Sequence, residues 1–146
     1  MDHRVGYRLI ASRGPEGMHQ GYHVYVGDVA AIRVIADRGQ WFVDVRPDPD
    51  RPEVSGWVGW FNLEAWGLCL GIEATFHSDS GRWPAILANS WRLAPQLDWL
   101  EAHLAEVQAA AAPERAGQTR LCLSEAQRAL SAFPPRDGGS FRGVET

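Results

Sequence analysis

Residues 31–46 read AIRVIADRGQWFVDVR, in which two apolar stretches flank the tetrapeptide DRGQ. Both stretches are rich in β-branched and aromatic residues, and the short connection contains a glycine, so the segment predicts a β-hairpin. Because successive side chains of a strand point to opposite faces, the second strand should present one face to the core and a mixed face to the other side. The two sets are Trp41, Val43 and Val45 against Phe42, Asp44 and Arg46.

Strands are predicted before the hairpin and helices after it. Apolar runs predict further strands at residues 5–11 and 22–26 and a short last strand at 57–60. The prolines of PDPDRPE, residues 47–53, interrupt the sheet because proline cannot donate to a central strand. This order predicts an α+β fold, with an antiparallel sheet of about four to five strands in the N-terminal part and about three helices packed on one face.

The longest helix is predicted from its apolar stripe, with Pro95 in its first turn. The stripe consists of Leu93, Leu97, Leu100, Leu104, Val107 and Ala111. The other face carries Asp98, Glu101 and Glu106, which predicts an exposed acidic ridge.

Two shorter helices are predicted on either side of it. Asn62 would cap the first, which carries Leu63, Trp66 and Leu70 on one stripe and ends at Gly71. A loop is predicted over residues 113–120. Ser124 and Gln127 then form a capping-box pattern that would begin the last helix.

The composition is that of a single globular domain, which we place at residues 1–133, with a flexible tail at 134–146. The chain has 146 residues and a net charge of −4, and it lacks a basic stripe, so nucleic acid is not expected as a ligand. No apolar run reaches the ~20 residues of a membrane span, so no membrane partner is expected. All 14 basic side chains are arginine, a bias that indicates a bacterial source. Without an export signal we expect a cytoplasmic protein, in which Cys69 and Cys122 are buried, reduced thiols.

No motif in the sequence indicates catalysis, a metal or a cofactor. His19 and His23 are four residues apart, but their segment is not helical and offers no third ligand. The loop TFHSDS at 75–80 collects polar side chains without an activating pattern, and Asp48 and Asp50 lie in a hydrated proline-rich loop. The sequence therefore predicts a non-catalytic protein that binds no metal or cofactor.

The tryptophans pose a choice between core and surface. Trp57 and Trp60 would point to opposite faces of an extended segment, so either both faces of the sheet are covered or one indole is left for a partner. Trp99 poses the same choice, because it lies beside Asp98 at the border of the leucine stripe.

Three segments together resemble the small acidic immunity proteins of bacterial toxin systems. They are IRVIADRGQWFVDVR, WFNLEAW and LDWLEAHLAEV, within residues 32–112. The resemblance implies a single domain that neutralises a basic toxin by covering its working surface, with acidic residues for electrostatic complementarity and tryptophan for a buried anchor. The candidate partner-binding residues are Asp48, Asp50, Glu53, Trp57, Trp60, Asp98, Trp99, Glu101 and Glu106.

Two other classes stay open at this point. One is a regulatory or scaffold domain that forms a homodimer through an apolar face. The other is a small-molecule-binding domain, or an unusual enzyme, with a pocket between the sheet and the helices.

Overall fold

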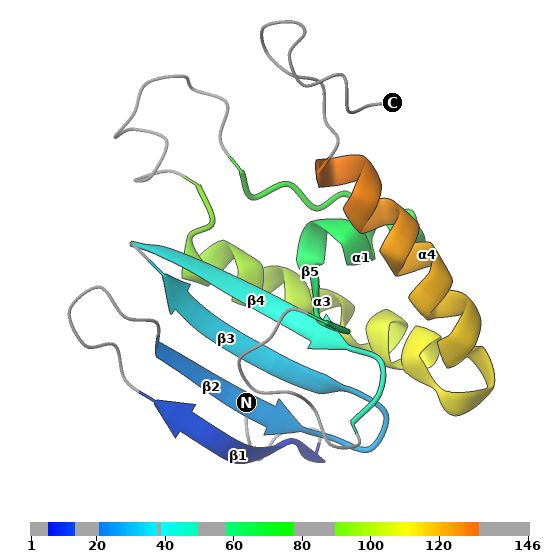
Figure 1. Ribbon diagram of the computed structural model, residues 1–146, viewed down its shortest axis with the longest axis horizontal. Helices are drawn as coiled ribbons and strands as arrows, with labels where there is room; N and C mark the ends of the chain where they lie inside the picture. Colours follow the sequence, from blue (N-terminus) through cyan, green and yellow to red (C-terminus); the bar gives the residue numbers. More distant parts are fainter. Residues whose placement is uncertain (1–5, 14–20, 38, 50–57, 78–89, 132–146) are drawn as a thin grey trace, which may run out of the picture.

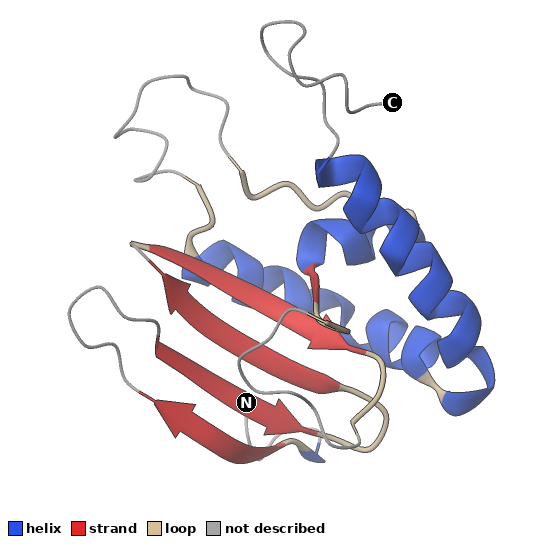
Figure 2. Cartoon of the chain, in the orientation of Figure 1, coloured by secondary structure: helices blue, strands red, loops and turns tan. Residues whose placement is uncertain are grey.

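The computed structural model describes residues 6–13, 21–37, 39–49, 58–77 and 90–131 (Figure 1). Within these residues, one antiparallel sheet contains five strands in sequence order: β1 (Arg8–Arg13), β2 (Gly21–Val26), β3 (Ala31–Asp37), β4 (Gln40–Arg46) and β5 (Phe61–Asn62). The helices that follow are α1 (Leu63–Leu70), α3 (Leu93–Ala111) and α4 (Pro113–Ser131). This arrangement confirms the predicted α+β fold (Figure 2).

The hairpin predicted from residues 31–46 is the centre of the sheet. Asp37 pairs with Gln40, and Gly39 in the turn has a φ of +85°, which glycine adopts without strain. The strand predicted at 57–60 is wrong as placed. Trp57 lies outside the described residues, Gly59 turns the chain with a φ of +82°, and the strand is the two-residue β5 that follows.

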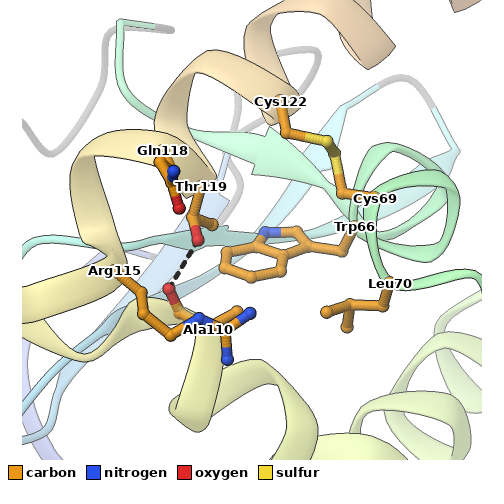
Figure 3. Close-up of a pocket in the computed structure, with 8 residues that line it drawn as sticks. All are labelled: Trp66, Cys69, Leu70, Ala110, Arg115, Gln118, Thr119 and Cys122. Carbon is orange, nitrogen blue, oxygen red and sulfur yellow. Dashed lines mark hydrogen bonds between the residues drawn. A yellow bond between two sulfur atoms is a disulfide. The ribbon is translucent and has the colours of Figure 1, made fainter.

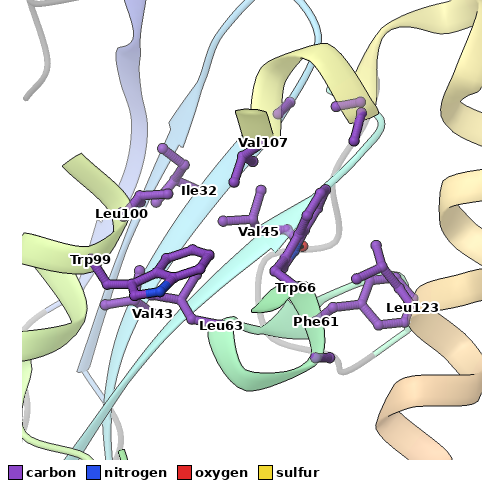
Figure 4. Packing of buried hydrophobic residues seen from close by; sticks show 14 of the residues in the cluster. Ile32, Val43, Val45, Phe61, Leu63, Trp66, Trp99, Leu100, Val107 and Leu123 are labelled. Carbon is purple, nitrogen blue, oxygen red and sulfur yellow. Dashed lines mark hydrogen bonds between the residues drawn. The ribbon is translucent and has the colours of Figure 1, made fainter. Parts of the chain in front are cut away.

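The helix-covered face of the sheet forms the main core. Ile32, Val43 and Val45 point toward the helices and are fully buried. They pack with Leu63 and Trp66 of α1, Trp99, Leu100 and Val107 of α3, and Leu123 of α4 (Figure 4). Trp66 also donates from Nε1 to the carbonyl of Val45 at 3.2 Å, which fixes α1 against β4. The predicted core face of β4 is confirmed for Val43 and Val45.

The opposite face of the sheet is also buried at its centre. Arg33 and Asp44 face each other across β3 and β4 and form an ion pair of 2.9 Å, with side chains 0% and 4% exposed. The indole of Trp60 lies over the Arg33 guanidinium at 4.7 Å and packs with Val24 and Ala31. Trp60 is therefore a core residue of this second face.

Beyond the short β5, β4 is hydrogen-bonded by one side chain of α3 and by the backbone just before that helix. Gln96 is fully buried, accepts from the backbone N–H of Val43 at 2.9 Å and donates to the carbonyl of Trp41 at 2.8 Å. The backbone N–H of Trp41 donates to the carbonyl of Trp91 at 2.9 Å. Because these bonds take the place of a strand neighbour, they set the position of the first turn of α3 on the sheet.

The ends of α1 are as predicted, and the start of α4 is not. Asn62 Oδ1 accepts from the backbone N–H of Ala65 at 3.0 Å, and Gly71 ends α1 with a φ of +73°. The loop predicted at 113–120 is helical, because α4 begins at Pro113, where a proline in the first turn leaves no helical hydrogen bond unmade. Thr119 on its buried side donates to the carbonyl of Ala110 at 2.6 Å.

The cysteines are joined, and the expectation of two reduced thiols is therefore wrong. Cys69 of α1 and Cys122 of α4 form a disulfide with a Cα–Cα distance of 6.0 Å. The bond is possible because α1 packs against α4, which brings together positions 53 residues apart in the sequence.

Candidate functional site

An open groove lies between the first turns of α3 and the segment that follows α1. Its volume is about 490 Å³. The lining residues are Glu73, Ala74, Thr75, Phe76, Pro95, Asp98 and Trp99. The groove thus places two of the predicted candidates, Asp98 and Trp99, beside Glu73, which the sequence did not single out, and beside the start of the loop TFHSDS.

Trp99 joins the two walls of the groove. Its Nε1 donates to the backbone carbonyl of Glu73 at 2.9 Å, and its side chain is only 9% exposed. Its ring also contacts the His103 ring at a centroid distance of 4.8 Å. Trp99 therefore belongs to the core beneath the groove, and the choice between core and surface is decided in favour of the core.

Glu64 holds the segment 72–77 in place. This carboxylate in the first turn of α1 is 5% exposed, and its Oε2 accepts from the backbone N–H groups of Phe76 at 2.6 Å and His77 at 3.0 Å. The same oxygen lies 2.8 Å from His77 Nδ1. The backbone N–H of Trp91 donates to the carbonyl of Phe76 at 2.7 Å, and the two rings are in contact. These contacts fix the wall of the groove opposite α3.

The charges on and beside the groove are acidic. Glu73 and Asp98 line it and are exposed. Glu101 and Glu106 continue along α3, are also exposed, and confirm the predicted exposure of the ridge. No arginine or lysine occurs between Leu93 and Ala111, and Arg92 comes immediately before the helix. The negative charge of the carboxylates on the first turns of α3 is therefore not balanced by any arginine or lysine within that helix.

Two further candidates that the structure describes, Trp60 and Asp48, do not line this groove. Trp60 is 3% exposed on the opposite face of the sheet. Asp48 follows β4, where its carbonyl accepts from Arg46 Nε at 3.0 Å and its carboxylate lies 4.0 Å from Arg46 Nη2. Asp50, Glu53 and Trp57 lie outside the described residues.

The chemistry of the groove suits a cation. Two carboxylates and a threonine hydroxyl supply acceptors, and Phe76 supplies an aromatic ring. A guanidinium or ammonium group can pair with carboxylates and lie over an aromatic face. Across residues 6–13, 21–37, 39–49, 58–77 and 90–131, no three His, Cys, Asp or Glu side chains are grouped as metal ligands would be.

A second cavity, of about 160 Å³, lies between α1, the end of α3 and the first half of α4 (Figure 3). Its lining residues are Trp66, Cys69, Leu70, Ala110, Arg115, Gln118, Thr119 and Cys122. A pocket between the sheet and the helices was one alternative that the sequence left open, whereas this cavity lies among the helices.

Comparison with known proteins yields no relative: no protein-family model, no curated protein and no solved structure matches this chain. Among its described helices, none combines the length and the apolar character required to cross a bilayer.

Proposed function

We propose that this protein is a non-catalytic domain that binds a basic protein partner through the groove between α3 and segment 72–77. The observation that carries the proposal is the placement of Glu73 and Asp98 on one aromatic-lined groove. An arginine side chain of the partner is the group that fits it best. Its planar guanidinium pairs with carboxylates in a fixed geometry and stacks on aromatic rings.

The exposed face of α3 extends the binding surface away from the groove. It consists of carboxylates and small side chains: Ala94, Asp98, Glu101, Ala102, Ala105, Glu106 and Ala109. Alanine side chains allow the backbone of a partner to approach closely, and the carboxylates between them attract basic residues during association. Trp99 supports this surface from below, so the anchoring side chain comes from the partner, contrary to the expectation from sequence.

Within this class we propose the immunity-type role, in which the partner is a toxin whose working surface is covered. The resemblance of residues 32–112 to acidic immunity proteins supports the role, and so does the acidic surface of α3. Toxins that act on nucleic acid carry basic surfaces, which are complementary to carboxylates.

The first experiment is affinity purification of the tagged protein from its native host, followed by measurement of the partner's Kd. Glu73→Gln and Asp98→Asn should each weaken binding by about tenfold, because each removes a partly desolvated charge from the interface. Glu125→Gln is the matched control, since Glu125 is exposed on α4 and does not line the groove. Equal Kd values for all three variants would rule out the groove.

The immunity role is tested by a separate measurement of growth. The partner should be toxic when expressed alone, and co-expression of the wild type should restore growth. The double variant Glu73→Gln/Asp98→Asn should restore growth less well than Glu125→Gln does. A partner that binds through the groove but is harmless when expressed alone would keep the binding function and overturn the immunity role.

A further inference from the structure

The cavity between the helices has a covalent bond in its wall. Both Cys69 and Cys122 line it, and Cys122 is exposed while Cys69 is half-buried. The disulfide is therefore accessible to a molecule that enters the cavity. In Figure 3 the Trp66 ring lies between the disulfide and the Arg115 side chain.

We propose that this cavity binds a small thiol that carries a carboxylate, and that this thiol exchanges with the Cys69–Cys122 disulfide. The size fits, because a cavity of about 150 Å³ holds a molecule of the size of benzene and this one has about 160 Å³. The site is distinct from the groove and does not depend on the proposed binding function.

The lining of the cavity favours a ligand with a negative charge. Arg115 is the one charged side chain among the lining residues, and the Gln118 amide offers a further donor. Trp66 and Leu70 supply the apolar surface for the carbon chain of the thiol. Arg115, Thr119 and Cys122 are four and three residues apart on α4, so they share one face of the helix and line the cavity together. The guanidinium binds the carboxylate of the incoming thiol.

The exchange is a displacement at sulfur. The thiolate of the small molecule attacks Cys122 Sγ, the sulfur of the more exposed cysteine, and forms a mixed disulfide with it. The bond between Cys122 and Cys69 breaks, and Cys69 leaves as a thiolate that takes a proton from solvent. No external oxidant or reductant is needed, because the attacking thiol supplies the electron pair. The covalent link between α1 and α4 is then lost.

The test compares two thiols with the same number of non-hydrogen atoms, mercaptopropionate, which is anionic, and thioglycerol, which is neutral. Each exchange rate, followed by intact mass, is divided by the rate of the same thiol with a small linear disulfide. After this correction mercaptopropionate should react about fivefold faster with the wild-type protein, the advantage expected from one exposed charge pair. Peptide mapping should place the adduct on Cys122.

Arg115→Gln should abolish the preference, while Arg128→Gln, an exposed arginine of the same helix outside the cavity, should retain it. The adduct should also lower the Tm by roughly 10 °C, because the long loop is no longer closed. Equal corrected rates for the two thiols, an adduct on Cys69, or a preference that survives Arg115→Gln would each overturn the proposal. Binding of the protein partner to wild-type protein would be unaffected by any of these results.

Discussion

The two faces of the central hairpin are both buried, but by different chemistry. On the helix side, Ile32 and Val45 of paired strands pack against apolar side chains. At the adjacent pair of the same two strands, on the other side of the sheet, Arg33 and Asp44 form a buried ion pair beneath Trp60. The alternation of side-chain directions along a strand therefore identifies the two faces of the sheet. Whether each face is buried depends on the residues that pack against it.

The two faces should also respond differently to substitution. An apolar contact weakens in proportion to the buried volume that is removed. A buried ion pair has already lost its hydration, so removing one partner leaves a charge with neither water nor counterion. Single substitutions should therefore be most damaging on the ion-pair face, where a paired substitution should be tolerated best.

The largest effect is expected for Asp44→Ala, which should lower the free energy of unfolding by about 3–5 kcal/mol at neutral pH. The double variant Arg33→Leu/Asp44→Leu removes both charges and should lose much less. Urea unfolding of the two proteins provides the comparison. A double variant less stable than the single one would show that the pair itself stabilises the fold.

On the helix side, Ile32→Ala should cost roughly 3 kcal/mol and Ile32→Val about 1 kcal/mol. Ile32 is fully buried among side chains from the helices, so the loss should follow the number of methyl and methylene groups removed. The same urea titrations measure it. An equal loss for both variants would contradict a packing origin.

The ion-pair face should also depend on pH. Burial raises the pKa of Asp44 above its ordinary value of 3.8, although the Arg33 guanidinium opposes the shift. As the pH rises, the Asp44 carboxyl therefore keeps its proton in the native state at pH values where it has already lost that proton in the unfolded chain. The part of the stability that depends on this proton is then fully present below about pH 3.8 and is lost as the pH rises through the raised pKa, whereas the pairing of ionised Asp44 with Arg33 remains at neutral pH.

Asp44→Asn isolates this contribution from those of the other carboxylates. The difference in unfolding free energy, wild type minus variant, should fall as the pH is raised from about 3.8 toward neutrality. A difference that rises with pH would mean that pairing with Arg33 outweighs burial, and that the pKa of Asp44 is lowered.

The smallest effect on the ion-pair face is expected for Trp60→Phe, at about 1 kcal/mol, because phenylalanine attracts a cation less strongly than tryptophan does. The loss should be smaller when Arg33 and Asp44 are both leucine, since no cation then lies beneath the ring and only the difference in packing remains. If Trp60→Phe costs the same in the Arg33→Leu/Asp44→Leu variant as in the wild type, the whole cost comes from packing.

Features that depend on neighbours in the sequence were predictable. The hairpin turn, the Asn62 cap and the stop at Gly71 are encoded within a few residues of where they act, and all three are confirmed. The first half of α4 was missed because its buried stripe begins with Ala116 and Thr119, which are small or polar and do not show apolar periodicity.

The groove was only half predictable. Asp98 and Trp99 could be found because α3 has a clear stripe from which they deviate. Glu73 and Phe76 lie in a segment without regular structure, and only the contacts of this segment with Glu64 and Trp99 bring them to α3. The disulfide was missed for a related reason, since it depends on which faces of α1 and α4 meet.

The link between Cys69 and Cys122 also matters when the protein is not folded. It closes a ring over a sequence separation of 53 residues that contains all of α3, and this ring persists in the denatured chain as long as the bond is oxidised. A chain with such a ring is more compact and exposes less surface on unfolding, so its denaturant m-value is smaller than that of the reduced protein. The oxidised and reduced proteins thus differ most in their denatured ensembles, where the acidic groove no longer exists.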